Sequence, residues 1–137
     1  CIEFFVLRDG RWVVNEMAPR PHNSGHVTMN ASSLSQFEAQ ARVCAGLALP
    51  WPRQHSAVVM QNLLGNLWFD GDTYREPDWT RVLALANDKA GIHLHLYGKA
   101  EARHGRKMGH LNITAATLAD ARQTLGQVRA VLGLAAA

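Results

Sequence analysis

The segment IEFFVLRDGRWVVNEM, residues 2–17, constrains the fold most, because it reads as two strands joined by a tight turn. Residues 2–7 and 12–17 are rich in β-branched and aromatic side chains, which favour strands. Between them, Asp9-Gly10 is a strong signal for a two-residue hairpin turn, since glycine tolerates the positive φ that such turns need. The sequence therefore predicts an antiparallel hairpin at the start of the chain.

The register of this hairpin places two acidic residues opposite each other. With a two-residue turn, Phe5 faces Val14 and Glu3 faces Glu16. Carboxylates in that position have Cβ atoms about 5 Å apart and repel each other. Either one glutamic acid is protonated, or a basic side chain inserts, or a divalent cation bridges the pair. We prefer the cation, because Mg²⁺ held by one or two carboxylates plus substrate phosphates is usual in ATP enzymes; a slipped register is the alternative.

The loop after the second strand carries a dense set of polar side chains. In chain order they are Arg20, His22, Asn23, Ser24 and His26, with Pro19 and Pro21 flanking Arg20. The prolines stiffen the exit from the strand, so we expect a preorganised loop; an ordinary surface loop is the alternative. His22 and His26 have the spacing of a helical zinc pair, but Pro21 and Gly25 disfavour a helix and hence a zinc site.

The remaining sequence predicts a mixture of helices and strands. Residues 33–46 have the period of an amphipathic helix, with Ser35 and Glu38 forming a capping box. The other expected elements are a Pro-containing linker (48–56), a strand (57–65), a short helix (78–88), two strands (92–99 and 107–113) and a C-terminal helix capped by Thr117. We therefore expect an α+β chain with a boundary in the linker, dividing it into residues 1–50 and 51–137.

Composition narrows the class of protein. The 137 residues are 47% hydrophobic and 18% charged, with a net charge of +3, which is ordinary for a globular chain with one core or two small subdomains. No Lys/Arg run is interleaved with aromatics, so a nucleic-acid role has little support. The sequence contains no apolar run of about 18 residues, so it predicts no membrane-spanning helix. Cys1 and Cys44 stand in apolar contexts, which predicts buried thiols in a reducing cytosol.

Three separated motifs resemble one family. EFFVLRDGRWVVNEMAPRPHNSGHVT (3–28) is similar to the end of the ATP-grasp domain of carboxyaminoimidazole ribonucleotide synthetases, the ATP-dependent carboxylases of purine biosynthesis. MQNLLGNLW (60–68) and LHLYGKAEARHGRKMGH (94–110) are similar to the family's small C-terminal domain. The resemblance implies the C-terminal part of an ATP-grasp domain, with antiparallel strands plus a helix, followed by a β-rich domain of the rudiment single-hybrid type.

The resemblance also implies a reaction and its cofactors. ATP and magnesium convert bicarbonate to carboxyphosphate, which carboxylates the exocyclic amine of aminoimidazole ribonucleotide. Glu3 and Glu16 match the two metal-binding acids, and Asn15 beside Glu16 is expected at the nucleotide and metal site. Many ATP-grasp members carry an asparagine where this chain has Ala18. Asn15 or Asn23 is then the expected substitute ligand.

Further site residues follow from the same resemblance. Arg20 is expected to contact bicarbonate or carboxyphosphate with its fork of donors, while His22, Asn23 and His26 are presented to the reacting groups. In the C-terminal domain, Lys99, Arg106 and Lys107 are expected to hold the ribonucleotide's 5′-phosphate; a solvated basic turn is the alternative. His93 and His95 share a strand face and are expected to be hydrogen-bonded sheet residues.

Two other classes compete with this interpretation. The loop 19–26, which begins with Pro-Arg-Pro-His, is called the PRPH loop. The formate-dependent glycinamide ribonucleotide transformylase shares its first four residues, but Asp-Thr-Gly-Met is expected where this chain has Asn23-Ser24-Gly25-His26. A non-catalytic nucleotide-binding domain is disfavoured by the intact Glu3 and Glu16. The chain begins inside a strand-like run without methionine, which predicts a piece of a longer protein. The resemblance implies a cytoplasmic, homodimeric full-length enzyme. It also implies that this piece is inactive alone, because ATP-grasp folds take their nucleotide-binding lysines and lid from sequence before Cys1.

Overall fold

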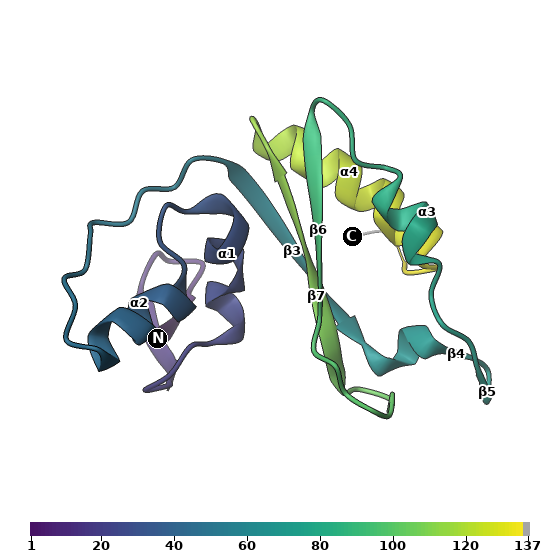
Figure 1. The fold of residues 1–137 in the computed structure, drawn as a ribbon, viewed down its shortest axis with the longest axis horizontal. Helices are drawn as coiled ribbons and strands as arrows, with labels where there is room; N and C mark the ends of the chain where they lie inside the picture. Colours follow the sequence, from purple (N-terminus) through teal and green to yellow (C-terminus); the bar gives the residue numbers. More distant parts are fainter. Residues whose placement is uncertain (136–137) are drawn as a thin grey trace. The chain divides into compact units, whose positions relative to one another are not determined.

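The structure is a computed structural model that describes residues 1–135 (Figure 1). The chain forms two compact units, Cys1–Arg53 and Gln54–Ala137. Both combine helices with antiparallel strands, which confirms the expected α+β class. Among the described residues, no helix has the length and apolar character needed to span a membrane.

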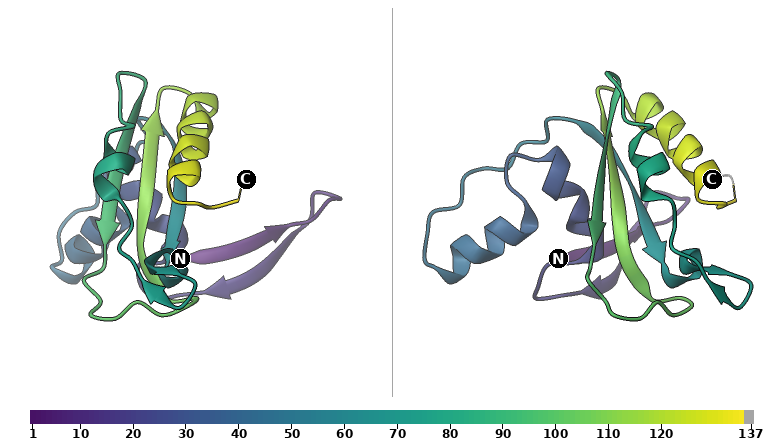
Figure 2. Two further views of the ribbon diagram at one scale, coloured as in Figure 1. Left: turned by 90° about the vertical axis from the view of Figure 1, so that its right-hand side faces the viewer. Right: turned by 45° about the vertical axis from the view of Figure 1, so that its right-hand side comes forward.

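The first unit contains a hairpin and a short helical region. β1 (Ile2–Val6) and β2 (Trp12–Met17) run side by side as a two-stranded ribbon (Figure 2). A 3-10 helix η1 (Asn23–Val27), α1 (Thr28–Ala31) and α2 (Gln36–Cys44) follow. α2 begins as expected, since the Ser35 side chain accepts a hydrogen bond from the Glu38 backbone N–H.

The apolar side chains of this unit are largely exposed in the chain. Every residue of β2 is exposed, and α2 buries none of its side chains. The prediction of buried thiols is wrong: Cys1 and Cys44 are both exposed, because neither the first strand nor the last turn of α2 is covered by a packed layer. Exposed apolar surface of this extent marks a contact surface.

The second unit is a three-stranded antiparallel sheet with helices on one face. The strands β3 (Ala57–Leu64), β7 (Lys107–Ala115) and β6 (Ala90–Leu96) are paired in that order. α3 (Trp79–Leu83) and α4 (Leu118–Val131) lie on the same side of this sheet (Figures 1 and 2). The smaller elements are η2 (Gly65–Trp68) and the two-residue strands β4 (Phe69–Asp70) and β5 (Thr73–Tyr74).

Alternation along β7 separates a core face from a polar face. Leu111 and Ile113 are fully buried beside Leu63 and Val128, so this face packs on α4. Full burial of each such side chain stabilises the fold by about 1.5–3 kcal/mol. The predicted strands and C-terminal helix are thus confirmed, with Thr117 as N-cap. The predicted helix at 78–88 is shorter and spans only Trp79–Leu83.

Gly65 permits a close approach that fixes the loop between β6 and β7. Its N–H donates to the Arg106 carbonyl at 2.8 Å, and a Cβ at this position would overlap the backbone of Arg103. Next to it, Asn66 Oδ1 accepts from the Gly105 N–H at 2.8 Å, and the His104 ring stacks on Phe69 with centroids 5.0 Å apart. The loop is therefore held against η2 along much of its length.

Replacing Gly65 by alanine is expected to destabilise the second unit. The overlap with backbone cannot be relieved by a rotamer change, so we expect a loss of about 1–3 kcal/mol in the free energy of unfolding measured with urea. Gly126→Ala is the matched control, because nothing lies within 4 Å of a Cβ there and alanine favours the helix by about 1 kcal/mol. Equal stability of the two variants would contradict the close approach.

Candidate active-site hairpin

The hairpin reaches the expected acid pair by an unexpected route. Its loop has three residues: Gly10 N–H donates to the Leu7 carbonyl, and Leu7 N–H donates to the Arg11 carbonyl, both at 2.9 Å. Gly10 has φ +82°, as a type I turn followed by a left-handed residue requires. The expected two-residue turn and the Phe5–Val14 pairing are therefore wrong, and Phe5 faces Val13.

A bulge in β2 restores the register beyond Val14. Phe4 faces Val14, whereas Glu3 faces Glu16, so Asn15 is the additional residue. A bulge leaves one residue unpaired and re-aims side chains. Accordingly, Asn15 Nδ2 reaches across the hairpin and donates to Glu3 Oε2 at 3.2 Å. The predicted pairing of Glu3 with Glu16 is confirmed, and the bulge adds Asn15 to it.

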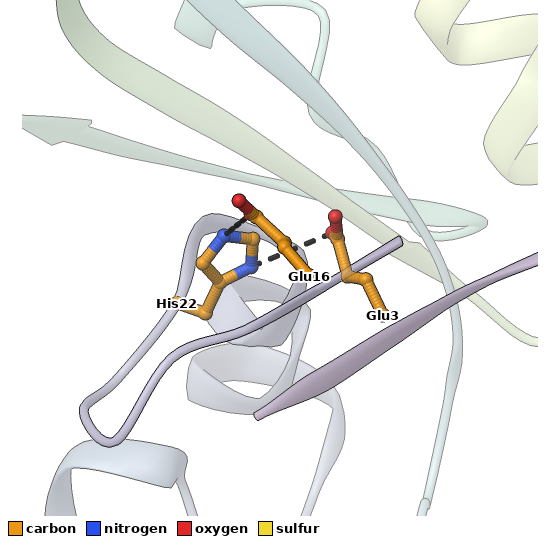
Figure 3. A group of neighbouring side chains, drawn as sticks. All are labelled: Glu3, Glu16 and His22. Atoms are coloured by element: carbon orange, nitrogen blue, oxygen red, sulfur yellow. Dashed lines mark ion pairs between the residues drawn. The ribbon is translucent and has the colours of Figure 1, made fainter. Parts of the chain in front are cut away.

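His22 lies between the two carboxylates (Figure 3). Its Nε2 is 2.7 Å from Glu16 Oε1, and its Nδ1 is 3.5 Å from Glu3 Oε1. The first is a short, charge-assisted contact, and the second exceeds ordinary hydrogen-bond length. Nδ1 also lies 2.9 Å from Ser24 Oγ. Of the three arrangements expected at the acid pair, the structure therefore shows an inserted side chain, the imidazole of His22.

The three residues also form a chemically suitable cation site. One ligand atom each from Glu3, Glu16 and His22 lies within 4.8 Å of the others. Their side chains are 30%, 54% and 13% exposed, so an ion reaches the carboxylates from solvent. Carboxylate oxygens are the ligands that Mg²⁺ prefers. The two carboxylates fit the expected ion, whereas an imidazole nitrogen suits transition metals better. Among the residues that the structure describes, this is the only group of three or more possible metal ligands.

The other residues predicted in the loop lie apart from this group. Arg20 is exposed, and its Nη1 donates to the Pro21 carbonyl at 3.0 Å. Asn23 Oδ1 is buried without a hydrogen-bond partner among the described residues. The His26 ring stacks on Phe37 with centroids 5.6 Å apart. The structure thus brings together Glu3, Asn15, Glu16 and His22.

Gln36 is a further residue of this region that the sequence did not single out. Its carboxamide lies 2.8 Å from the backbone of His22 and 2.8 Å from His26 Nδ1. Gln36 falls at the first position of the expected helix, where a polar side chain is unremarkable. The one hint in the sequence was Gly25, which lies close to Gln36 in space. A Cβ at Gly25 would overlap the Gln36 carboxamide.

In the second unit, the expected phosphate contacts gather on the loop between β6 and β7. Lys99 Nζ donates to the Lys107 carbonyl and lies 5.6 Å from the Tyr97 ring centroid. Arg106 Nη1 donates to the Glu101 carbonyl at 3.0 Å. Lys107 is exposed at the start of β7. The three cations therefore occupy one loop and the first residue of the adjoining strand.

One acid in this loop neutralises a different cation. The Glu101 carboxylate lies 2.7 Å from Arg103 Nη2, and this hydrogen bond lowers the pKa of Glu101. In the described part of the chain, Lys99 and Arg106 form no ion pair within 4.0 Å. Neutral carbonyls orient both cations, and Arg106 acts on the Glu101 carboxylate only through a smaller, longer-range electrostatic contribution to its lowered pKa.

The strand histidines behave as sheet residues. His93 Nε2 lies 3.0 Å from Thr114 Oγ1, and the His95 ring stacks on His110 with centroids 4.6 Å apart. Burial lowers the pKa of both His93 and His95, which favours neutral rings. Their expected role as hydrogen-bonded sheet residues fits these contacts.

Comparison with known proteins identifies the family. Residues 1–37 match the model of the ATP-grasp domain, and residues 58–124 match that of the phosphoribosylaminoimidazole carboxylase C-terminal domain. The N5-carboxyaminoimidazole ribonucleotide synthase of Brucella melitensis is 48% identical over 110 residues, which cover 80% of this chain and 27% of that protein.

Solved structures agree with these matches. The N5-carboxyaminoimidazole ribonucleotide synthetase from Thermotoga maritima is 37% identical with a TM-score of 0.80, covering 95% of this chain and 35% of that one. The Aspergillus clavatus synthase, in complex with ADP and 5-aminoimidazole ribonucleotide, is 32% identical with a TM-score of 0.73, covering 96% and 34%. The chain thus spans about a quarter to a third of these relatives.

The paired acids therefore lie on the hairpin of an ATP-grasp domain. The chain belongs to the N5-carboxyaminoimidazole ribonucleotide synthase family, whose C-terminal domain matches its residues 58–124. This match favours the carboxylase over the transformylase with the shared PRPH loop.

Proposed function

We propose that this chain contributes to the ATP- and bicarbonate-dependent carboxylation of aminoimidazole ribonucleotide in purine biosynthesis. The observation that carries the proposal is the convergence of Glu3, Asn15, Glu16 and His22 on a segment that matches the ATP-grasp domain. Residues 1–50 would then supply part of the ATP site, and residues 51–137 part of the substrate site. The exposed apolar face of the hairpin fits burial against further sheet in such a domain.

The reaction divides into two transfers. A bicarbonate oxygen attacks the γ-phosphorus of ATP and ADP leaves, giving carboxyphosphate. The exocyclic amine of the ribonucleotide then attacks the carboxyl carbon, phosphate leaves and the amine loses a proton. Glu3 and Glu16 would hold magnesium, which supplies neutralisation of charge on the ATP phosphates. Asn15, whose Nδ2 donates to Glu3 Oε2, would orient that carboxylate and contribute to the nucleotide site.

The PRPH loop would serve the reacting groups. Arg20 offers a guanidinium whose Nη1 donates to the Pro21 carbonyl. Its remaining donors have no partner among the described residues and suit bicarbonate or carboxyphosphate. His22, Asn23 and His26 supply side chains that accept or donate protons and hydrogen bonds beside it. Asn23 supports this role, because its buried Oδ1 lacks a partner among the described residues, and buried polar atoms are rarely left so.

The basic loop of the second unit suits a phosphate monoester. Lys99 and Arg106 are oriented by carbonyl groups, which hold the side chains without neutralising their charge. Arginine binds phosphate through parallel N–H donors and lysine as a point charge. Lys107 adds a third positive charge. We therefore assign the ribonucleotide's 5′-phosphate to this loop. Homodimeric assembly and a cytoplasmic location stay predictions of the family resemblance.

Glu16→Gln tests the metal role. It is introduced into a protein that carries this chain together with the rest of an ATP-grasp domain. We expect substrate-dependent ATP hydrolysis to fall on the order of a hundredfold or more, because one charged ligand is lost where phosphate charge develops. Circular dichroism should show an intact fold. Glu38→Gln is the control, since Glu38 pairs with Arg42 on the surface of α2. Near-normal turnover at ordinary magnesium would contradict the assignment.

Arg106→Ala tests the phosphate contact in the same protein. The phosphate is remote from the reacting amine, so its contacts contribute uniform binding and act on KM. We expect the KM for aminoimidazole ribonucleotide to rise about ten- to a hundredfold, a loss of roughly 1.5–3 kcal/mol, with the KM for ATP nearly unchanged. Arg103→Ala is the matched control, because that guanidinium is already paired with Glu101. Equal effects of the two variants on this KM would contradict the phosphate contact and favour the alternative, a solvated basic turn.

A further inference from the structure

Gln36 makes a set of hydrogen bonds that no ordinary helix-start residue needs. Its Oε1 accepts from the His22 backbone N–H at 2.8 Å, and its Nε2 donates to the His22 carbonyl at 2.8 Å. Its own backbone N–H donates to Thr28 Oγ1 at 2.9 Å, and the Thr28 hydroxyl donates to the Gly25 carbonyl at 2.6 Å. One residue therefore bonds to both ends of the loop that carries His22 and His26.

The backbone of His22 dictates the orientation of the Gln36 carboxamide. An N–H group only donates and a carbonyl only accepts, so Oε1 must face the His22 N–H and Nε2 must face the His22 carbonyl. This removes the usual ambiguity between the oxygen and nitrogen of a glutamine side chain. Nε2 has two hydrogens, of which the His22 carbonyl takes one.

The second hydrogen fixes the chemistry of His26. His26 Nδ1 lies 2.8 Å from Gln36 Nε2. Because Nε2 only donates, Nδ1 must accept, and the neutral ring carries its proton on the other nitrogen. The ring plane is fixed as well by stacking on Phe37. The geometry thus selects one tautomer of His26 as well as one position.

We propose that Gln36 is the positioning residue of the PRPH loop: its carboxamide clamps the backbone of His22 and holds His26 as the Nε2–H tautomer. The inference rests on the proposed function in one respect, namely that this loop faces the reacting groups. Clamping His22 keeps its ring between Glu3 and Glu16. Holding one tautomer gives His26 a fixed donor and acceptor side, which proton transfer requires.

Crowding around the carboxamide supports a dedicated role. A Cβ on Gly25 would overlap the Gln36 carboxamide, so a larger residue at position 25 would displace that carboxamide from its hydrogen bonds. The alternative, a carboxylate at position 36, would accept from the His22 N–H but present only acceptors to His26 Nδ1 and the His22 carbonyl. Among side chains of this length, glutamine alone offers a carbonyl acceptor together with two N–H donors on one group.

The tautomer is measurable in the 137-residue chain without any substrate. A long-range proton–nitrogen correlation spectrum at about pH 8, where an ordinary histidine is neutral, distinguishes the two tautomers of each ring. We expect His26 with its proton on Nε2. In Gln36→Glu we expect the proton to move to Nδ1, facing the carboxylate. Gln40→Glu, an exposed position on the same helix, should leave His26 unchanged. A His26 proton on Nδ1 in the unmodified chain would overturn the proposal, whatever the variants do.

Kinetics separate positioning from a structural role. In the protein with a complete ATP-grasp domain, Gln36→Glu should lower kcat about tenfold or more, since small misplacement of reacting groups is costly, while leaving the KM for ATP nearly unchanged. An unaltered kcat, or an equal loss in Gln40→Glu, would overturn the positioning role. Retained turnover in Glu16→Gln would instead refute the proposed function and leave the tautomer result standing.

Discussion

Two carboxylates that face each other across a hairpin repel, and the arrangement of the first unit depends on how that repulsion is relieved. Glu3 and Glu16 are directly opposed. The His22 ring enters between them, and the Asn15 amide donates to Glu3. The loop that follows β2 must therefore fold back onto the hairpin, which places His22 beside the acid pair. A cation at the same carboxylates would offset their mutual repulsion further.

The second unit uses the opposite device. There, Lys99 and Arg106 are oriented by neutral carbonyls and form no direct ion pair among the described residues. Gly65 admits the loop between β6 and β7 onto η2, and carbonyls orient Lys99 and Arg106, while the loop's acid pairs with Arg103.

The sequence predicted the elements better than the details that build the site. The pairing of Glu3 with Glu16 followed from a two-residue turn that the structure does not have. An Asp-Gly pair also suits a three-residue loop with glycine in the left-handed region, and that loop shifts the register by one residue. The bulge at Asn15 shifts it back, so two unforeseen features cancel. Bulges leave no reliable signal in a strand of this length.

Other features depended on tertiary packing, which local patterns do not encode. Gln36 occupies an unremarkable helix position, and its importance comes from the return of residues 22–28 past it. The exposure of Cys44 follows from a helix with no packed layer over it in this chain. By contrast, the capping residues Ser35 and Thr117 were predicted correctly, because a cap is decided within a few residues of sequence.

Paramagnetic relaxation by Mn²⁺ shows most directly whether the bulged hairpin forms a divalent-cation site. Substoichiometric Mn²⁺ is added to the nitrogen-15-labelled chain. If the hairpin binds the ion, we expect selective loss of amide signals around Glu3, Asn15-Glu16 and His22. Excess Mg²⁺ should reverse this loss, and Glu16→Gln should abolish it. The acidic residues of the second unit, such as Asp70 and Asp78, serve as an internal reference. Loss of signal at Asp70 and Asp78 that equals or exceeds the loss at the hairpin would contradict a cation site on the hairpin.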